Sequence, residues 1–284
     1  MDSNQSQAEP FTDPRVGLGL LLVGHGTRDP QGLEAFRNLH QLVAERAGKL
    51  PVEACFLELA EPDIKAGIEA LLERGAQQIV IAPLLLFAAG HAKRDIPEGV
   101  AEALRQLSET DEAARAARIV AQLPPLAYHA KLLALSAMRY REAKPLGEQG
   151  RAEDIAAEDT TLILVGRGSS DAEAQADMFH LGQLRAEQLP GVKVEVCFYA
   201  LAEPKLEAIL AQVAKSTARR VVVQPHLLFA GEVQRGIELQ AEKQAALAGD
   251  RQQWWLCLPL GPDRRLAAAL RDLLEAALRS IKKS

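Results

Sequence analysis

Two stretches of sequence decide the fold: LLLVGHGTRD at residues 20–29 and LILVGRGSSD at residues 162–171. Each places an apolar run before a Gly-X-Gly turn, and the second begins 142 residues after the first. The same offset relates VEACFLELAEP at 52–62 to VEVCFYALAEP at 194–204, and a third pair of runs, IVIAPLLLF and VVVQPHLLF, keeps it. Three anchors with one offset indicate a tandem duplication. Two copies of so long a unit are not a solenoid.

Each copy alternates strand-like and helix-like segments. Apolar runs without period-two alternation predict strands that are buried on both faces, as in a parallel sheet. In the first copy these runs lie at 17–23, 52–57, 78–84 and 118–122, and in the second near 161–165, 192–199, 219–224 and 254–258. The helix-like stretches of the first copy lie at 32–48, 61–75, 96–107 and 128–142, and the second copy ends with one at about 262–281. Pro62 is expected in the first turn of its helix.

This order predicts an α/β protein of two homologous domains, each a mainly parallel four-stranded sheet flanked by helices, with an active-site cleft between them. The polar residues 1–15 are expected to form a disordered leader. The first domain is expected to span residues 16–143, the charged stretch 144–159 to be the linker, and the second domain to span residues 160–284.

Composition excludes several classes of protein. The formal net charge is −5 and aromatic residues make up 4%, so nucleic-acid binding is not expected. The longest apolar stretch, 79–90, is too short to span a membrane and contains Pro83. The three cysteines form no CxxC pair, which favours buried free thiols over disulfides or a zinc site. A cytoplasmic protein is therefore predicted.

Three reactive side chains of the first copy fall where predicted strands end. His25 follows the first strand, Glu58 ends the second, and His91 follows the third. Ligands of open parallel sheets bind at the carboxyl ends of the strands, so these side chains are expected along one rim. Two imidazoles and a carboxylate there could bind a divalent metal ion. They could equally transfer protons near neutral pH.

The second copy serves as an internal control. Arg167 corresponds to His25, Ala200 to Glu58 and, after a one-residue deletion, Glu232 to His91. The glycines on both sides of His25 are repeated around Arg167, and the Ala-Glu-Pro triplet is present in both copies. The three differences together favour a first domain specialised for chemistry and a second domain that has become a wall of the cleft.

Alternative readings remain for some of these residues. Glu58 could instead cap the helix that starts near residue 61. His226, at a strand end beside Pro225, could line the cleft or lie in the core, and the place of Glu232 is likewise open. The apolar run 84–87 belongs to the core by default.

The motifs carry a family resemblance. GHGTRD, CFLELAEP and PLLLFAAGHAKRDIP (residues 83–97) resemble the sirohydrochlorin chelatases, the class II enzymes that insert cobalt or iron into sirohydrochlorin for siroheme or cobalamin biosynthesis. The resemblance covers almost the whole chain. It implies an ATP-independent metal chelatase, a lyase, in which His25 and His91 are catalytic and Glu58 is their companion at the metal site.

The resemblance also implies the substrates. A tetrapyrrole is a flat apolar ring fringed with carboxylates, so Phe87 is expected to contact the ring. Arg28, Arg94 and Arg167 are expected to bind its edge. The metal, Co²⁺, Fe²⁺ or Ni²⁺, is a substrate. No permanent cofactor is expected, and no iron–sulfur cluster, because a His-rich tail and cluster cysteines are missing from the sequence. The duplicated length resembles the two-domain relatives and implies a monomer with internal pseudo-two-fold symmetry.

Two other functions use the same residues. A carrier of the metal or the tetrapyrrole could employ these histidines without turnover. A histidine phosphatase is suggested by GHG, but that chemistry needs Arg before the histidine, and residue 24 is Gly. Which histidine acts as the base is left open by the sequence.

Overall fold

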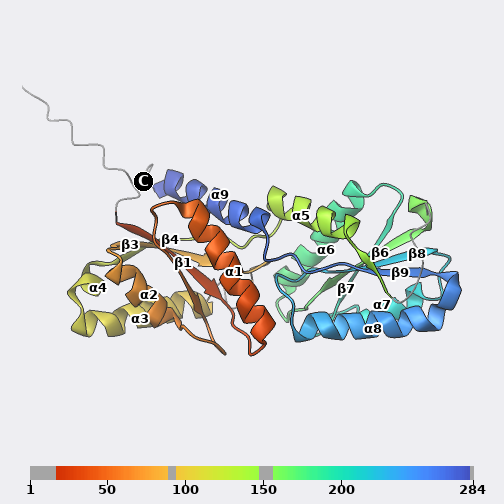
Figure 1. Ribbon diagram of the computed structural model, residues 1–284, viewed down its shortest axis with the longest axis horizontal. Helices are drawn as coiled ribbons and strands as arrows, with labels where there is room; N and C mark the ends of the chain where they lie inside the picture. Colours follow the sequence, from red (N-terminus) through yellow and green to blue (C-terminus); the bar gives the residue numbers. More distant parts are fainter. Residues whose placement is uncertain (1–16, 89–93, 147–155, 282–284) are drawn as a thin grey trace, which may run out of the picture.

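The computed structural model describes residues 17–88, 94–146 and 156–281. Two lobes, each a sheet with helices packed around it, lie side by side along the long axis of the molecule (Figure 1). The predicted α/β architecture is confirmed in both halves.

The first sheet contains four parallel strands. They are β1 (Leu18–Gly24), β2 (Val52–Phe56), β3 (Gln78–Pro83) and β4 (Arg118–Gln122), and their order across the sheet is β2-β1-β3-β4. Every residue of β1 is buried, which explains its continuous apolar sequence. The order makes β2 and β3 the two neighbours of β1, so the loops after these three strands share one edge.

The second sheet repeats this arrangement and adds one strand. It contains β6 (Thr160–Gly166), β7 (Lys193–Phe198), β8 (Arg220–Pro225) and β9 (Gln253–Leu256), with β7-β6-β8-β9 matching β2-β1-β3-β4. The short β5 (Lys144–Pro145) pairs antiparallel with β9, so this sheet has five strands where four were predicted. Two residues that include a proline carry no alternation or apolar run from which the fifth strand could be predicted.

Helices cover both sheets. The first half contains α1 (Pro30–Ala47), α2 (Ile64–Glu73), α3 (Ile96–Thr110), α4 (Glu112–Ala116) and α5 (Ala130–Arg141). The second contains α6 (Ala172–Gln188), α7 (Leu206–Val213), α8 (Glu232–Ala248) and α9 (Arg264–Ile281), with 3₁₀ turns at Ala157–Asp159 and Gly249–Arg251.

The prediction that Pro62 lies in the first turn of its helix was wrong. Asp63 is the cap of α2 and accepts from the Ala66 amide, so Pro62 lies before the helix.

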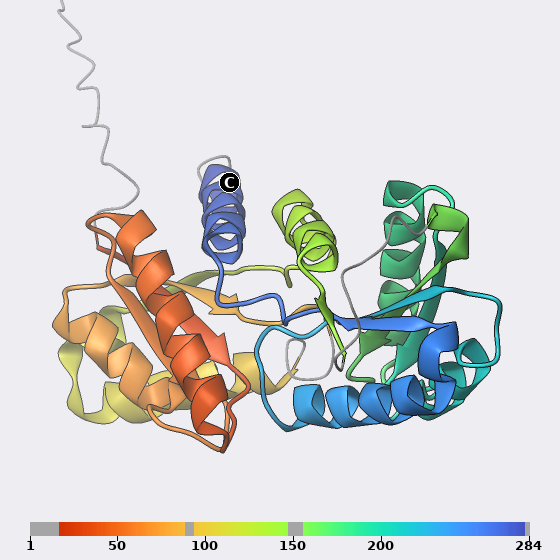
Figure 2. The ribbon, with the colours of Figure 1, turned by 45° about the vertical axis from the view of Figure 1, so that its right-hand side comes forward.

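The last helix of each half packs against the other half. α9 lies along α1, and its Leu266, Leu270 and Leu274 are buried in the same apolar cluster as β1. α5 packs on α6 and β8, where the side-chain Nε2 of Gln224 donates to the backbone carbonyl of Ser136 at 2.7 Å. Figure 2 shows α5 and α9 next to each other between the lobes. This exchange ties the two halves into one unit.

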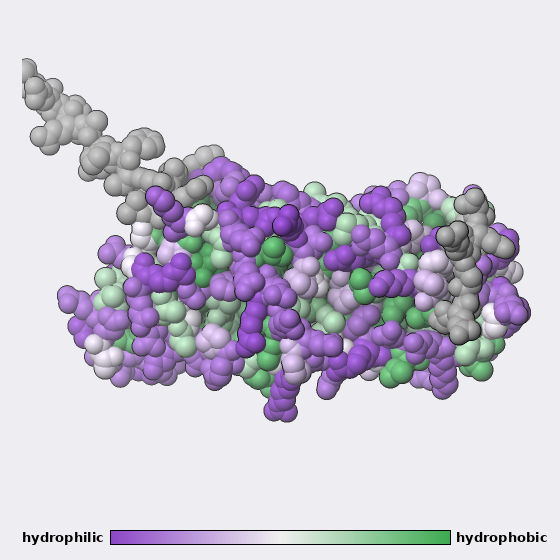
Figure 3. Space-filling model, in the orientation of Figure 1, coloured by the Kyte–Doolittle hydropathy of each residue, from purple (hydrophilic) through white to green (hydrophobic). Residues whose placement is uncertain are grey.

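The face of the molecule in Figure 3 is polar over most of its area, with apolar side chains in small scattered groups. Within the described ranges of the chain, no helix is long and apolar enough to cross a membrane.

Candidate active site at the interdomain cleft

Backbone hydrogen bonds beyond the ends of β1 and β2 bring the predicted site residues together. The Leu57 amide donates to the Gly24 carbonyl at 2.9 Å, and the Glu58 amide donates to the His25 carbonyl at 3.1 Å. Gly26 makes this close approach possible, because it has φ 101° and a Cβ there would lie 1.7 Å from the Glu58 carbonyl oxygen. The second glycine of the GHG motif, Gly26, therefore allows the side chains of residues 25 and 58 to lie side by side.

The two side chains meet at this edge of the sheet. His25 Nε2 lies 3.2 Å from Glu58 Oε1, and the side chains are 25% and 52% exposed, respectively. Two ligands that each lie about 2.1 Å from one metal ion, at tetrahedral to octahedral angles, are roughly 3.0 to 3.4 Å apart. The observed separation therefore suits a shared proton and equally suits a metal ion held by both atoms.

The second half repeats this backbone arrangement, in which the loop after one strand is hydrogen-bonded to the loop after the neighbouring strand. We call the arrangement the frame, and in the second half it carries different side chains. The Ala200 amide donates to the Arg167 carbonyl at 2.9 Å. Gly168 has φ 96°, and a Cβ there would lie 1.7 Å from the Ala200 carbonyl oxygen. The backbone has thus been retained while the imidazole and carboxylate have been replaced by guanidinium and methyl.

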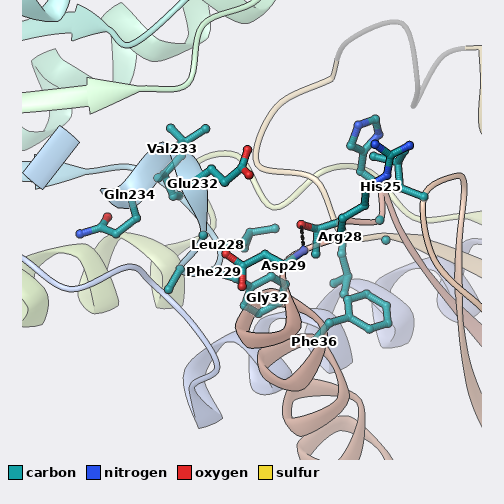
Figure 4. A pocket seen from close by; sticks show the side chains of 18 of the residues that line it. His25, Arg28, Asp29, Gly32, Phe36, Leu228, Phe229, Glu232, Val233 and Gln234 are labelled. Carbon is teal, nitrogen blue, oxygen red and sulfur yellow. Dashed lines mark hydrogen bonds between the residues drawn. The ribbon is translucent and has the colours of Figure 1, made fainter. Parts of the chain in front are cut away.

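A cleft of about 510 Å³ lies between the two frames. His25 and Arg28 lie on its first-half side, and Glu232, Val233 and Gln234 face them from α8 (Figure 4). Its lining residues are Gly24, His25, Gly26, Thr27, Arg28, Asp29, Gly32, Phe36, Phe56, Leu59, Leu84, Arg167, Leu227, Leu228, Phe229, Ala230, Gly231, Glu232, Val233 and Gln234. Both halves contribute apolar and charged side chains to this lining, which suits an apolar ligand with charged substituents.

An ion pair joins the halves at the cleft wall. Arg235 Nη1 of α8 lies 2.8 Å from Asp29 Oδ2. Asp29 also caps α1 by accepting from the Gln31 amide at 2.9 Å. The arginine beside Asp29, together with that amide, holds the pKa of the Asp29 carboxyl below its usual range. Arg235 is therefore paired with a carboxylate of this chain.

The structure places the other predicted residues as follows. Arg28 and Arg167 line the cleft from opposite halves, and Glu232 lines it at the start of α8. Arg94 is exposed just before α3 and is outside this lining. His91 lies outside the described residues. Among those described, no three His, Cys, Asp or Glu side chains form a group that could hold a metal ion.

Two phenylalanines of the repeated LLF segments occupy different environments. Phe229 lines the cleft and contacts Phe36, with ring centroids 6.3 Å apart. Its counterpart Phe87 packs against the second half, with its ring 6.1 Å from Tyr128 and 5.5 Å from His226. Each segment thus inserts into the opposite half. Of the pair, Phe229 is the one in contact with the cleft.

His226 belongs to the core. It is 3% exposed, and its backbone amide donates to the Val165 carbonyl at 2.8 Å. Burial, with a smaller contribution from the positive charge of Arg185, lowers the pKa of His226 to about 3. It is therefore a neutral packing residue at physiological pH.

Sequence reasoning missed several residues that line the cleft. Phe36, Val233 and Gln234 lie on helices, where their spacing indicated only a buried face. Leu59 lies in the loop after Glu58, and the LAEP motif around it is repeated in the second half at Leu201. That repetition was the available signal.

The fold and the cleft together define a two-domain α/β protein of the chelatase class, with an imidazole–carboxylate pair at the edge of one sheet. The CbiX family model matches residues 19–143 and 161–277, and the chain belongs to this family. Both halves are matched separately, as the duplication requires.

Individual relatives match more than nine tenths of the chain. It is 33% identical over 267 residues to a sirohydrochlorin ferrochelatase of Priestia megaterium, covering 92% of this chain and 91% of the relative. It is 29% identical to a sirohydrochlorin cobaltochelatase of the same organism, over 91% of this chain and 79% of the relative. Among solved structures, SirB from Bacillus subtilis with Fe³⁺ superposes with a TM-score of 0.77 and 26% identity, covering 94% of this chain and 98% of SirB.

Proposed function

We propose that this protein inserts cobalt or iron into sirohydrochlorin without ATP. The observation that carries the proposal is the His25–Glu58 pair, which lies 3.2 Å apart at the interdomain cleft of a CbiX-family chain. Full-length relatives named as sirohydrochlorin ferrochelatase and cobaltochelatase support both metals.

The incoming metal is held by His25 and Glu58, with His91 as the third ligand. The order β2-β1-β3 supports this set, because His91 follows the strand beside β1 on the side opposite β2. Neutral imidazole and carboxylate suit Fe²⁺, Co²⁺ and Ni²⁺ alike. Selection among them therefore depends on geometry and supply.

Insertion releases the two inner N–H protons of the ring, and a base must accept them. A neutral imidazole can accept a proton near neutral pH, and the adjacent Glu58 stabilises the imidazolium that results. Metal affinity and proton acceptance both require the unprotonated histidine, so the two steps share one pH dependence.

The cleft holds the ring among apolar and charged side chains that both halves contribute. Phe36, Leu228 and Phe229 contact the apolar face of the macrocycle. Arg28 and Arg167, from opposite halves, bind carboxylates on its edge. Arg94 and Phe87 remain predicted substrate-binding residues. Because both are outside the cleft lining, they would contact only a part of the substrate that extends beyond the cleft.

The described part of the cleft needs no second chain. Both walls of the cleft come from this chain, and the exchanged helices α5 and α9 bury the contact between its halves. We therefore propose a monomer with internal pseudo-two-fold symmetry.

The test is an anaerobic insertion assay with sirohydrochlorin and each of Fe²⁺, Co²⁺ and Ni²⁺, followed through the absorption bands of the ring. Wild-type protein should accelerate insertion of iron or cobalt over the protein-free rate, with turnover beyond one equivalent. Binding of ring and metal with no turnover would identify a carrier instead.

A further inference from the structure

Two leucines have a conformation and an exposure that folding alone does not explain. Leu59 has φ 64° and Leu201 has φ 59°, a left-handed backbone region that disfavours L-residues with a bulky side chain. The two residues are 49% and 67% exposed, respectively. A turn with this conformation is served best by glycine or asparagine, so the leucines carry a conformational cost without the compensation of burial.

The two residues occupy equivalent places in the duplicated frames. Leu59 follows Glu58, whose amide donates to the His25 carbonyl, and Leu201 follows Ala200, whose amide donates to the Arg167 carbonyl. The frame has thus kept a strained leucine in both halves, although the neighbouring residues 58 and 200 differ. Strain of this kind is found at functional positions.

Their location connects them to the substrate. Leu59 lines the cleft. Leu201 is outside this lining, but it directly follows Ala200, whose amide is hydrogen-bonded to the carbonyl of the cleft residue Arg167. A macrocycle whose centre receives a metal from His25 and Glu58 would lie within reach of Leu59, because Leu59 lines the same cleft as His25. A ring edge bound to Arg167 would likewise come near the loop that holds Leu201, because the two loops are hydrogen-bonded to each other.

We propose that Leu59 and Leu201 are a pair of substrate-binding residues that project from the two halves and contact the apolar surface of the tetrapyrrole. The inference rests on the proposed function and deepens it. The left-handed backbone aims each leucine away from its own core, and the bound ring removes its apolar surface from water. One leucine acts next to the metal ligands and the other next to the cation that binds the ring edge.

The test uses Leu59→Asn and Leu201→Asn. Asparagine has nearly the size of leucine and tolerates the left-handed region, but it lacks the apolar surface. Each variant should raise the Kd for metal-free sirohydrochlorin about fivefold to tenfold, as expected for a leucine that loses its contact with the ring. Each should leave the Tm unchanged or higher, because strain is relieved.

The matched control is Leu239→Asn on α8. Leu239 is 66% exposed and lies in a regular helix outside the cleft lining. This variant should lower the Tm, since asparagine is a poor helix former, and should leave the Kd for the ring unchanged. Co²⁺ alone should bind Leu59→Asn as tightly as wild type.

Unchanged ring affinity in either leucine variant would overturn the proposed pair, as would a fall in Tm that accompanies the loss of affinity. Loss of Co²⁺ affinity in Leu59→Asn would show that the substitution acts through Glu58, and would overturn it too. Wild-type protein that does not bind sirohydrochlorin would overturn the proposed function and this inference together. If the wild-type protein binds sirohydrochlorin and both leucine variants bind it equally tightly, the inference alone would be overturned.

Discussion

Arg235 Nη1 of the second half lies 2.8 Å from Asp29 Oδ2, the carboxylate that caps the helix behind the GHG loop. The pair therefore links the wall of the cleft to the loop that carries His25. Its energetic effect depends on the charge of Asp29. The hydrogen bond from Arg235 is the largest cause of the lowered Asp29 pKa, and the Gln31 amide adds to it.

Arg235→Gln should remove this ion pair, and its cost should depend on pH. Because the folded-state pKa of Asp29 lies below the reference of 3.8, the pair stabilises the fold above that value and loses its effect as the pH falls through the folded-state pKa. The wild type should therefore exceed the variant in free energy of unfolding at pH 5 to 7, and the two should converge below about pH 4. Urea unfolding across this range measures the difference. A gap that stays constant to pH 3 would exclude Asp29 as the partner.

The double variant His25→Arg/Glu58→Ala gives the first half the side chains that the second half carries at equivalent positions. The fold should be retained, because the frame around Arg167 and Ala200 already accommodates them. Metal insertion should fall by about 100-fold or more, as a ligand pair and a proton acceptor are lost together. Circular dichroism checks the fold and the anaerobic assay checks the rate. Activity within a few-fold of wild type would place the chemistry elsewhere.

Arg167→Ala should act on substrate binding. Arg167 is exposed in the cleft on the half opposite His25, where it can pair with a substrate carboxylate. Loss of a charged hydrogen bond should raise KM about tenfold and change kcat less. The charge-matched control is Arg279→Ala, because Arg279 lies at the end of α9 and should leave both constants unchanged. A kcat loss with constant KM would instead make Arg167 a catalytic residue.

The pH profile of insertion tests the histidines. If neutral imidazole is both ligand and base, kcat/KM should fall on the acid side with a midpoint within about one unit of 6.5, the ordinary pKa of histidine. Glu58→Gln removes a carboxylate that favours the imidazolium, so the acid limb of the remaining activity should move to lower pH. A profile that is flat from pH 5 to 8 would exclude histidine from both roles.

The sequence predicted the parts of the site that follow from strand order. His25 and Glu58 could be placed together because adjacent parallel strands end at one edge, and the duplication showed which half had changed. The same reasoning predicted that residue 91 shares that edge. This remains a prediction, because His91 lies outside the described residues.

Other features depended on contacts that periodicity does not encode. The pattern of α9 indicates an apolar face but not the sheet it covers, so the packing of Leu266 and Leu270 against the first half was not foreseen. Phe87 and Phe229 are equivalent in sequence, and only the structure shows that Phe229 lines the cleft. Arg235 could not be matched with Asp29 because its partner is more than 200 residues away in the sequence.

His226→Leu should change how stability depends on pH. The corresponding residue of the first half is Leu84, which is buried at the end of β3, so leucine suits the position. Burial lowers the pKa of His226 to about 3, while an unfolded histidine titrates near 6.5. Between these values the unfolded chain binds the extra proton, so the histidine destabilises the fold increasingly as the pH falls below about 6.5. The variant should gain free energy of unfolding relative to wild type by up to about 1.4 kcal/mol for each pH unit from 6 to 4.

The control is His226→Gln, which also cannot titrate. Its free energy of unfolding should depend on pH with the same slope as that of His226→Leu, even if its packing lowers stability at pH 7. Urea unfolding at half-unit steps measures the slopes, and parallel curves for the wild type and both variants would mean that His226 protonates in the folded protein as readily as in the unfolded chain.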